Sequence, residues 1–204
     1  MPQKDGITNF FRIFAAYFER NRYYETRKDM KKVMILAVLM IIGTAIEVSA
    51  QLPSVTLKDI NGKTVETDTL SNGGNPMIIS FFATWCKPCN RELDAISEVY
   101  EEWQAETGVK LVAISVDQAQ NINKVKPLVD QHEWPFETVL LDPNGEFKRQ
   151  LGIKMIPYVF IIDGQGKIVY KHIGYTDGAE EELIEKIRSM ALSSDVEGNK
   201  KQKK

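Results

Sequence analysis

Hydrophobic and polar positions follow two different periods along residues 51–192, and each change of period separates a strand from a helix. The segment SVTLKDING alternates apolar and polar residues and ends in Asn61-Gly62, which predicts a hairpin turn before KTVETDTL. The continuous apolar run MIISFFATW is rich in β-forming residues and too short to be a helix of its own. That run therefore predicts a buried central strand.

A helical period begins directly after this run. Apolar residues recur at offsets of four, three, four and three, which place them on one face of a helix. These residues are Cys89, Leu93, Ile96, Tyr100 and Trp103. The chain thus passes from strand to helix at the two cysteines that it contains, Cys86 and Cys89.

The same alternation continues toward the C-terminus. GVKLVAISVD and FETVLLD are typical of strands, NINKVKPLVDQHEW between them predicts a helix interrupted by Pro127, and GEFKRQLGI predicts a short helix. MIPYVFIID and IVYKHIGY predict two strands joined by the glycine turn GQGK, and AEEELIEKIRSMAL an amphipathic closing helix. We expect one α/β domain at residues 51–192, with three layers around a mixed sheet, followed by a disordered polar tail at 193–204.

Residues 30–50 differ in character from the domain that follows. MKKVMILAVLMIIGTAIEVSA begins with two lysines and is almost purely apolar from Val33 to Ile46, about 14 residues, the length of a signal-peptide core. The compact residues Val48-Ser49-Ala50 suit signal peptidase, so we expect an exported, periplasmic chain that begins at Gln51. The alternative is that residues 33–48 remain as a membrane anchor, which the acidic Glu47 disfavours.

Residues 1–29 are unusual in front of a signal peptide, because such a segment normally starts only a few residues before its apolar core. We interpret Met30 as the start of translation. The alternative is an amphipathic stretch, ITNFFRIFAAYFERNRYY, lying on the cytoplasmic membrane surface. The mass of the native protein distinguishes the two.

Composition narrows the function classes. The chain has 26 basic and 28 acidic side chains and 43% apolar residues, so it is globular and its net charge of −2 gives no reason to expect a nucleic-acid partner. Two cysteines are too few for a disulfide scaffold, and a domain of this size needs none. The cysteines therefore act as a pair.

A Cys-x-x-Cys pair at a strand-to-helix turn favours thiol chemistry. Cys86 lies near the helix N-terminus, where free backbone N–H groups and the helix dipole stabilise a thiolate, so it is the expected attacking group. Cys89 lies one turn further on, on the apolar stripe, and is the expected resolving group. Lys87 adds a nearby cation, and Pro88 fits the first helical turn and stiffens it.

Other roles for the two cysteines fit less well. A structural zinc site needs four ligands, and the chain adds only His132 and His172, both distant in sequence. Covalent haem attachment would require histidine where Asn90 stands. A purely structural disulfide closing so short a loop gains little. We expect a redox pair with no metal and no cofactor.

The segment ATWCKPCNRE resembles the active site of thioredoxin-superfamily proteins, and specifically of the TlpA/ResA-like thiol-disulfide oxidoreductases. The resemblance covers about residues 52–192 and implies a thioredoxin-like fold. The signal segment, the N-terminal strand pair and a βα-type insertion, NINKVKPLVDQHEWPFETVLLD, are the features similar to this branch.

The resemblance also implies roles for single residues. Ile156-Pro157 falls where the family has a cis-proline beside which a substrate peptide can pair; the alternative is an ordinary trans proline. Glu92 matches a glutamate that would manage the proton of the resolving thiol; the alternative is a solvated acid. Ser80 stands where thioredoxin has a buried aspartate, and Trp85 is expected to contact substrate.

The resemblance implies an enzyme that reduces disulfides in exported proteins, including apocytochrome c thiols awaiting haem. Its electron donor would be a membrane thiol-reductant carrier. The alternatives are a periplasmic disulfide oxidase or isomerase, a peroxiredoxin-like thiol peroxidase, and a non-enzymatic partner-binding module. Reduction potential separates reductase from oxidase.

Overall fold

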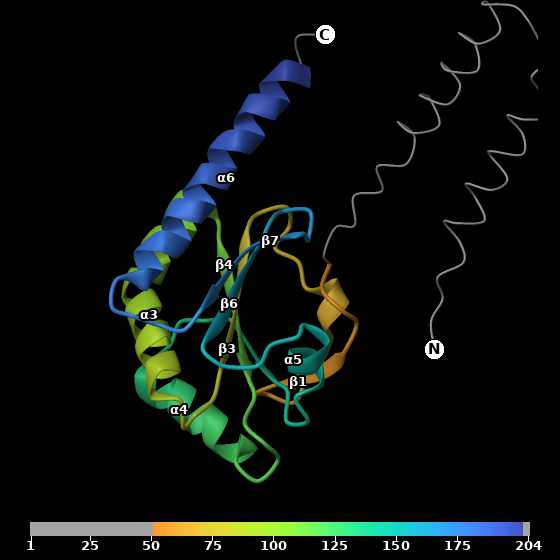
Figure 1. The fold of residues 1–204 in the computed structure, drawn as a ribbon, viewed down its shortest axis with the longest axis vertical. Coiled ribbons are helices and arrows are strands. Elements are labelled where there is room, and N and C mark those ends of the chain that lie inside the picture. The colour runs from red at the N-terminus through yellow and green to blue at the C-terminus, as the bar shows by residue number, and fades with distance from the viewer. Residues whose placement is uncertain (1–50, 202–204) are drawn as a thin grey trace, which may run out of the picture. The chain divides into compact units, whose positions relative to one another are not determined.

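The computed structural model describes residues 51–201, and their side chains up to residue 190. Strands and helices alternate along this part of the chain (Figure 1). The strands are β1 Thr56–Asp59, β2 Thr64–Glu66, β3 Met77–Phe82, β4 Lys110–Ser115, β5 Thr138–Leu141, β6 Tyr158–Ile162 and β7 Ile168–Ile173. The helices are α3 Lys87–Thr107, α4 Val125–His132, α5 Glu146–Gln150 and α6 Ala179–Lys201, with 3-10 turns η1 Thr67–Thr69 and η2 Ile122–Lys124.

The described strands form one mixed sheet in the order β2-β1-β5-β4-β3-β6-β7. Strands β3, β4 and β5 are parallel to one another. On one side of them β6 pairs antiparallel with β3, and β7 pairs antiparallel with β6. On the other side β1 pairs antiparallel with both β5 and β2. The central β3 is buried along its whole length, as its continuous apolar run predicts. The predicted mixed sheet and N-terminal strand pair are confirmed.

Helices cover both faces of this sheet. α3, α4 and α6 lie on one face and the short α5 on the other, which gives the predicted three layers (Figure 1). Alternate residues of β3 serve the two cores: Ile78 and Phe82 pack with α3, whereas Ile79 and Phe81 pack with α5. The apolar stripe of α3 is buried as predicted, and each such side chain contributes about 1.5–3 kcal/mol.

The N-terminal hairpin closes through a turn that its sequence specifies. The Asp59 carboxylate accepts hydrogen bonds from the backbone N–H groups of Asn61 and Lys63, each at 2.8 Å. Gly62 follows with φ +86°, a conformation that favours glycine. Leu57 consequently pairs with Val65 in the register of the strand pair.

Two helices differ in extent from what the sequence predicts. Pro127 does not interrupt α4, because it lies in the first turn, where backbone N–H groups have no partner within the helix. α6 continues to Lys201, so the structure places residues 193–201 in this helix rather than in a tail. The tail sequence contains no proline, and extending a formed helix costs little.

Within the described residues, no helix combines the length and apolar character needed to span a membrane. The expected extension at 1–29, the signal segment at 30–50 and the alternative anchor at 33–48 lie outside the described residues.

Candidate active site

The two cysteines lie at the start of α3, on the turn that leads out of β3. Cys86 is the N-cap residue, and its sulfur accepts a hydrogen bond from the Cys89 backbone N–H at 3.3 Å. A disulfide joins the two residues, whose Cα atoms are 5.3 Å apart. Cys86 is 5% exposed and Cys89 fully buried, so an incoming thiolate reaches Cys86 first. In the reduced protein the same N–H group would stabilise a thiolate on Cys86.

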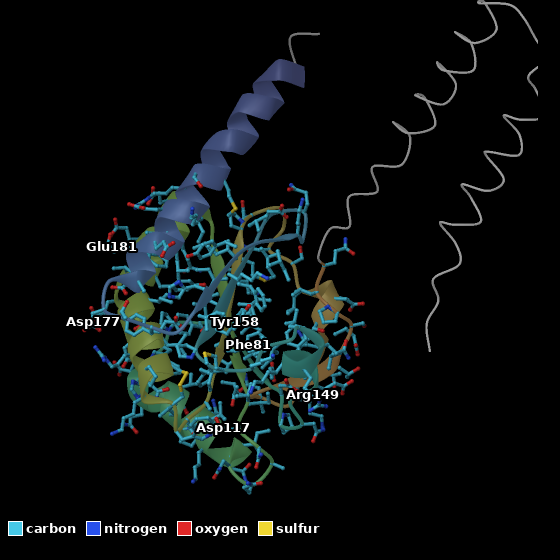
Figure 2. All side chains as sticks on the ribbon, in the orientation of Figure 1. Phe81, Asp117, Arg149, Tyr158, Asp177 and Glu181 are labelled. Carbon is cyan, nitrogen blue, oxygen red and sulfur yellow. A yellow bond between two sulfur atoms is a disulfide. The ribbon has the colours of Figure 1, made fainter. Side chains whose placement is uncertain are left out.

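A buried carboxylate holds the loop in front of Cys86. Asp117, at the end of β4, accepts hydrogen bonds from the Thr84 backbone N–H and the Thr84 hydroxyl, both at 2.7 Å. The Ser115 hydroxyl donates a third at 3.0 Å. Asp117 is fully buried, and Figure 2 labels it at the lower end of the sheet, just beyond the end of β4. Three donors offset the cost of burying this acid, so the loop that carries Trp85 and Cys86 is fixed from behind.

Glu92 is a second buried acid, one helical turn beyond Cys89 on α3. It is 1% exposed, which makes the alternative of a solvated acid wrong. The pKa of Glu92 is raised to about 8: burial is the largest cause, the hydrogen bond from the Ser80 hydroxyl opposes the rise, and the negative charge of Glu180 adds to it. That hydrogen bond, Ser80 Oγ to Glu92 Oε2, is 3.0 Å long. Residues three apart on a helix are neighbours on its surface, so Glu92 follows Cys89 on the buried side of α3.

Two large apolar side chains at the end of the sheet that carries the cysteine turn are exposed. Trp85 is 66% exposed and Met155 60%, unusual values for large apolar side chains. The Ile156-Pro157 peptide bond is cis, as the resemblance of the active-site segment to the family implies. Because β6 pairs antiparallel with β3, this bond lies at the same end of the sheet as the cysteine turn.

Lys87 and Pro88 form the first turn of α3 and are both exposed. Proline fits this position because the first N–H groups of a helix have no partner within it. The two residues therefore separate the cysteines in sequence and keep their own side chains in solvent.

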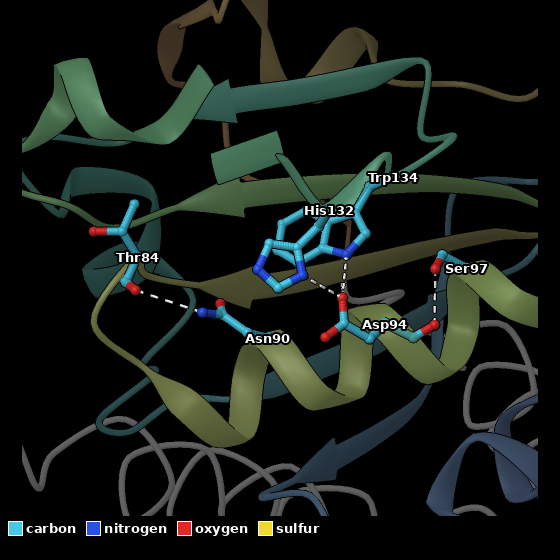
Figure 3. Close-up of polar contacts among 6 residues, drawn as sticks. All are labelled: Thr84, Asn90, Asp94, Ser97, His132 and Trp134. Carbon is cyan, nitrogen blue, oxygen red and sulfur yellow. Dashed lines mark hydrogen bonds and ion pairs between the residues drawn. The ribbon is translucent and has the colours of Figure 1, made fainter. Parts of the chain in front are cut away.

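A polar cluster joins α3 to the end of α4 (Figure 3). The Asp94 carboxylate accepts a hydrogen bond from Trp134 Nε1 at 2.7 Å and lies 2.7 Å from His132 Nδ1. Trp134 also packs edge-on against Phe82, with ring centroids 5.5 Å apart. His132 is thus part of a contact between α3 and α4. One turn earlier on the same helix, the Asn90 side-chain amide donates a hydrogen bond to the Thr84 carbonyl at 3.4 Å.

Within the described residues, no group of three or more His, Cys, Asp or Glu side chains could hold a metal ion. The structure joins Ser80 and Glu92 through a hydrogen bond, which the sequence alone did not predict. The sequence expectation did not include Asp117 or Asp94. No local signal pointed to Asp117, because its partner Thr84 lies 33 residues away in the sequence.

Comparison with known proteins adds a family to this geometry. Residues 48–171 match the model of the AhpC/TSA family. The thiol-disulfide oxidoreductase ResA of Bacillus thuringiensis subsp. konkukian is 31% identical over 142 residues, which cover 69% of this chain and 79% of that protein. A thiol:disulfide interchange protein DsbE homolog of Paracoccus denitrificans is 28% identical over 127 residues, covering 62% and 66%.

A solved structure agrees with the fold. A thioredoxin-like protein from Porphyromonas gingivalis is 63% identical, covers 69% of this chain and 92% of its own, and superimposes with a TM-score of 0.62. The thioredoxin-like fold expected from the sequence is therefore confirmed.

Proposed function

Because this chain belongs to the AhpC/TSA family and is a thiol-disulfide oxidoreductase of the ResA and DsbE type, we propose that it reduces disulfides in exported proteins. The observation that supports this most directly is the Cys86–Cys89 disulfide at the start of α3, in which Cys86 retains 5% exposure and Cys89 is fully buried.

The reaction proceeds as two thiol-disulfide exchanges. The Cys86 thiolate attacks one sulfur of a substrate disulfide, forms a mixed disulfide and expels the other substrate sulfur as a thiolate. Cys89 then gives up its proton and attacks the Cys86 sulfur, which releases the second substrate thiolate. Two electrons pass to the substrate, its two thiolates take up protons, and the Cys86–Cys89 disulfide remains.

Glu92 exchanges the proton of the buried sulfur. With its pKa raised to about 8 by burial, it is mainly protonated at neutral pH in the oxidised protein. When a donor thiolate attacks Cys86 to re-reduce the enzyme, Cys89 leaves as a buried thiolate and Glu92 supplies the proton. In substrate reduction the same proton returns from Cys89 to Glu92.

Substrate lies against the exposed surface around Cys86. Trp85 supplies an apolar contact next to the reacting sulfur, and Lys87 and Pro88 bound the other side. Ile156 and Pro157 offer a backbone edge to an extended substrate chain, as the family resemblance implies.

Export follows from the signal segment at residues 30–50. Outside the cytoplasm the enzyme needs a continuous supply of electrons, so we propose a membrane thiol-reductant carrier as its donor. Apocytochrome c, whose two haem-binding thiols must stay reduced, is the proposed substrate among disulfide-bonded exported proteins. Fractionation of cells that express the native gene tests export, because the mature protein should start at Gln51 and leave the cytoplasm.

The reduction potential of Cys86–Cys89 tests the direction of electron flow. Equilibration with glutathione, read out by trapping free thiols, should give a value well below the glutathione poise. A potential at or above that poise would make the enzyme an oxidase or isomerase and overturn the proposal. Peroxide consumption by the reduced protein, measured in the same preparation, should be negligible.

A further inference from the structure

A groove of about 470 Å³ opens beside Trp85. One wall is the cysteine loop, with Thr84 and Trp85; the other is the inserted segment, η2 and the start of α4. The volume is within the range that protein pockets use to bind small ligands or peptide side chains. Trp85 directly precedes Cys86, so the groove adjoins the loop that carries the attacking sulfur.

The groove combines an apolar surface with unused hydrogen-bonding groups. Pro127 and Leu128 of α4 face it together with the exposed Trp85 ring. The side-chain amides of Asn121, Asn123 and Gln131 line it as well, and none of them forms a hydrogen bond with the described residues. Amides provide both donors and acceptors, which is what the backbone of an extended peptide requires.

Charge at the groove is opposite to that of the domain. Residues 51–190 contain 14 basic and 21 acidic side chains, yet Lys124 lines the groove and Lys87 follows Cys86. Neither lysine forms an ion pair within the described residues, whereas Arg91 and Arg188 each pair with an acid. An acidic domain that keeps an unpaired cation in this groove, and another directly after Cys86, attracts acidic partners to this end of the molecule.

The groove wall is fixed. α4 is tied to α3 through the Asp94 carboxylate, which contacts both His132 and Trp134 at 2.7 Å. A preorganised wall loses less entropy on binding, so small contacts translate into selectivity.

We propose that this groove binds the segment of the substrate chain adjacent to its reacting cysteine, and that it prefers an apolar residue followed by an acidic one. The inference rests on the proposed function and adds to it a class of substrate sequence. The apolar side chain packs on Trp85 and Leu128, the amides bond the peptide backbone, and Lys124 contacts the acidic group.

Two peptides test the proposal. Each carries one cysteine as a mixed disulfide with mercaptoethanol, followed by Leu-Glu in one peptide and Leu-Lys in the other. Stopped-flow rates with the fully reduced protein should favour the Leu-Glu peptide by about fivefold at low salt, and less at high salt. Lys124→Glu should reverse this preference, whereas Lys63→Glu, with the same change of charge in the distant β1–β2 turn, should keep it.

A third peptide with Ser-Glu isolates the apolar contact. Leu128→Ala should slow the reaction with the Leu-Glu peptide about threefold more than with the Ser-Glu peptide. Equal rates for all peptides, or the same preference in the Lys124 and Lys63 variants, would overturn the proposal that this groove binds the substrate chain. Hydroxyethyl disulfide, too small to reach the groove, tests the wild-type reaction itself: if it is not reduced, the proposed function fails and the groove inference fails with it.

Discussion

Two carboxyl groups are buried close to the cysteine turn, and they differ in the number of hydrogen-bond donors around them. Asp117, behind the loop, accepts three hydrogen bonds from Thr84 and Ser115. Glu92, on the active-site helix, accepts one, from Ser80. Both side chains are at most 1% exposed, and neither forms an ion pair within the described residues. Burial alone therefore does not determine what an acid does.

The difference lies in how the charge of each acid is compensated. Three donors satisfy the oxygens of Asp117, so this side chain suits a structural role as a hydrogen-bond acceptor. One neutral hydroxyl does not offset the desolvation of Glu92, and its pKa rises to about 8. An acid that gains and loses a proton near neutral pH can serve an exchange reaction, whereas a fully bonded acid holds the loop that presents Cys86.

The largest expected effect is on the pH dependence of stability. Folded Glu92 keeps its proton up to about pH 8, whereas the unfolded chain loses it near 4.5. Between these values the folded state binds more protons, so raising the pH favours unfolding, by about 1.4 kcal/mol per pH unit and up to about 5 kcal/mol in total. Glu92→Gln removes this dependence, and urea unfolding of the oxidised protein from pH 5 to 9 should show a variant increasingly more stable than wild type.

Glu98→Gln is the matched control, because Glu98 is exposed on the same helix. Its stability curve should run parallel to that of the wild type. If the curve of the Glu92 variant also runs parallel, the carboxyl is ionised in the folded protein, and the contrast with Asp117 disappears.

Asp117→Ala tests the other acid. The substitution leaves the Thr84 N–H, the Thr84 hydroxyl and the Ser115 hydroxyl without their acceptor, which should cost about 3 kcal/mol in the free energy of unfolding by urea. Asp130→Ala, which removes an exposed acid from α4, should change it by less than about 0.5 kcal/mol. Similar losses in the two variants would show that the buried hydrogen bonds do not support the loop.

Re-reduction of the disulfide measures the proposed chemical role of Glu92. With dithiothreitol at pH 7, the oxidised Glu92→Gln protein should react about tenfold more slowly than wild type, a barrier increase of about 1.4 kcal/mol, because no acid protonates the departing Cys89. Above pH 8 wild-type Glu92 is itself ionised, so the ratio of the two rates should approach one. A ratio that is constant over pH would assign the slower rate to altered packing. Glu98→Gln should match the wild type throughout.

The sequence predicted the strands and helices well because their patterns are local. The apolar run of β3, the α3 stripe and the Asn61-Gly62 turn each specify their own conformation, and all are confirmed. The prediction that Pro127 interrupts the helix was wrong, because α4 begins where η2 ends and the proline lies in its first turn.

The candidate site was predictable only where its residues are close in sequence. Cys86 and Cys89 share one turn, but Ser80 and Glu92 meet only because β3 packs under α3, a contact across the fold. Spacing along the helix left the exposure of Glu92 open, and exposure decides its pKa. Asp117 lies 33 residues from Thr84, so no local pattern connects them.

The smallest expected effect comes from the one donor that Glu92 has. The Ser80 hydroxyl lowers the pKa of this carboxyl, so Ser80→Ala should raise the pKa above about 8, by about half a unit to one unit. The chemical shift of the Glu92 carboxyl carbon, followed through a pH titration of the oxidised protein, reports this directly. Ser97→Ala, which removes a hydroxyl bonded to a backbone carbonyl on the same helix, should leave the titration unchanged. A lower pKa in the Ser80 variant would mean that water enters beside Glu92 and replaces the lost donor. A higher one would confirm that the Ser80 hydroxyl stabilises the ionised form of Glu92.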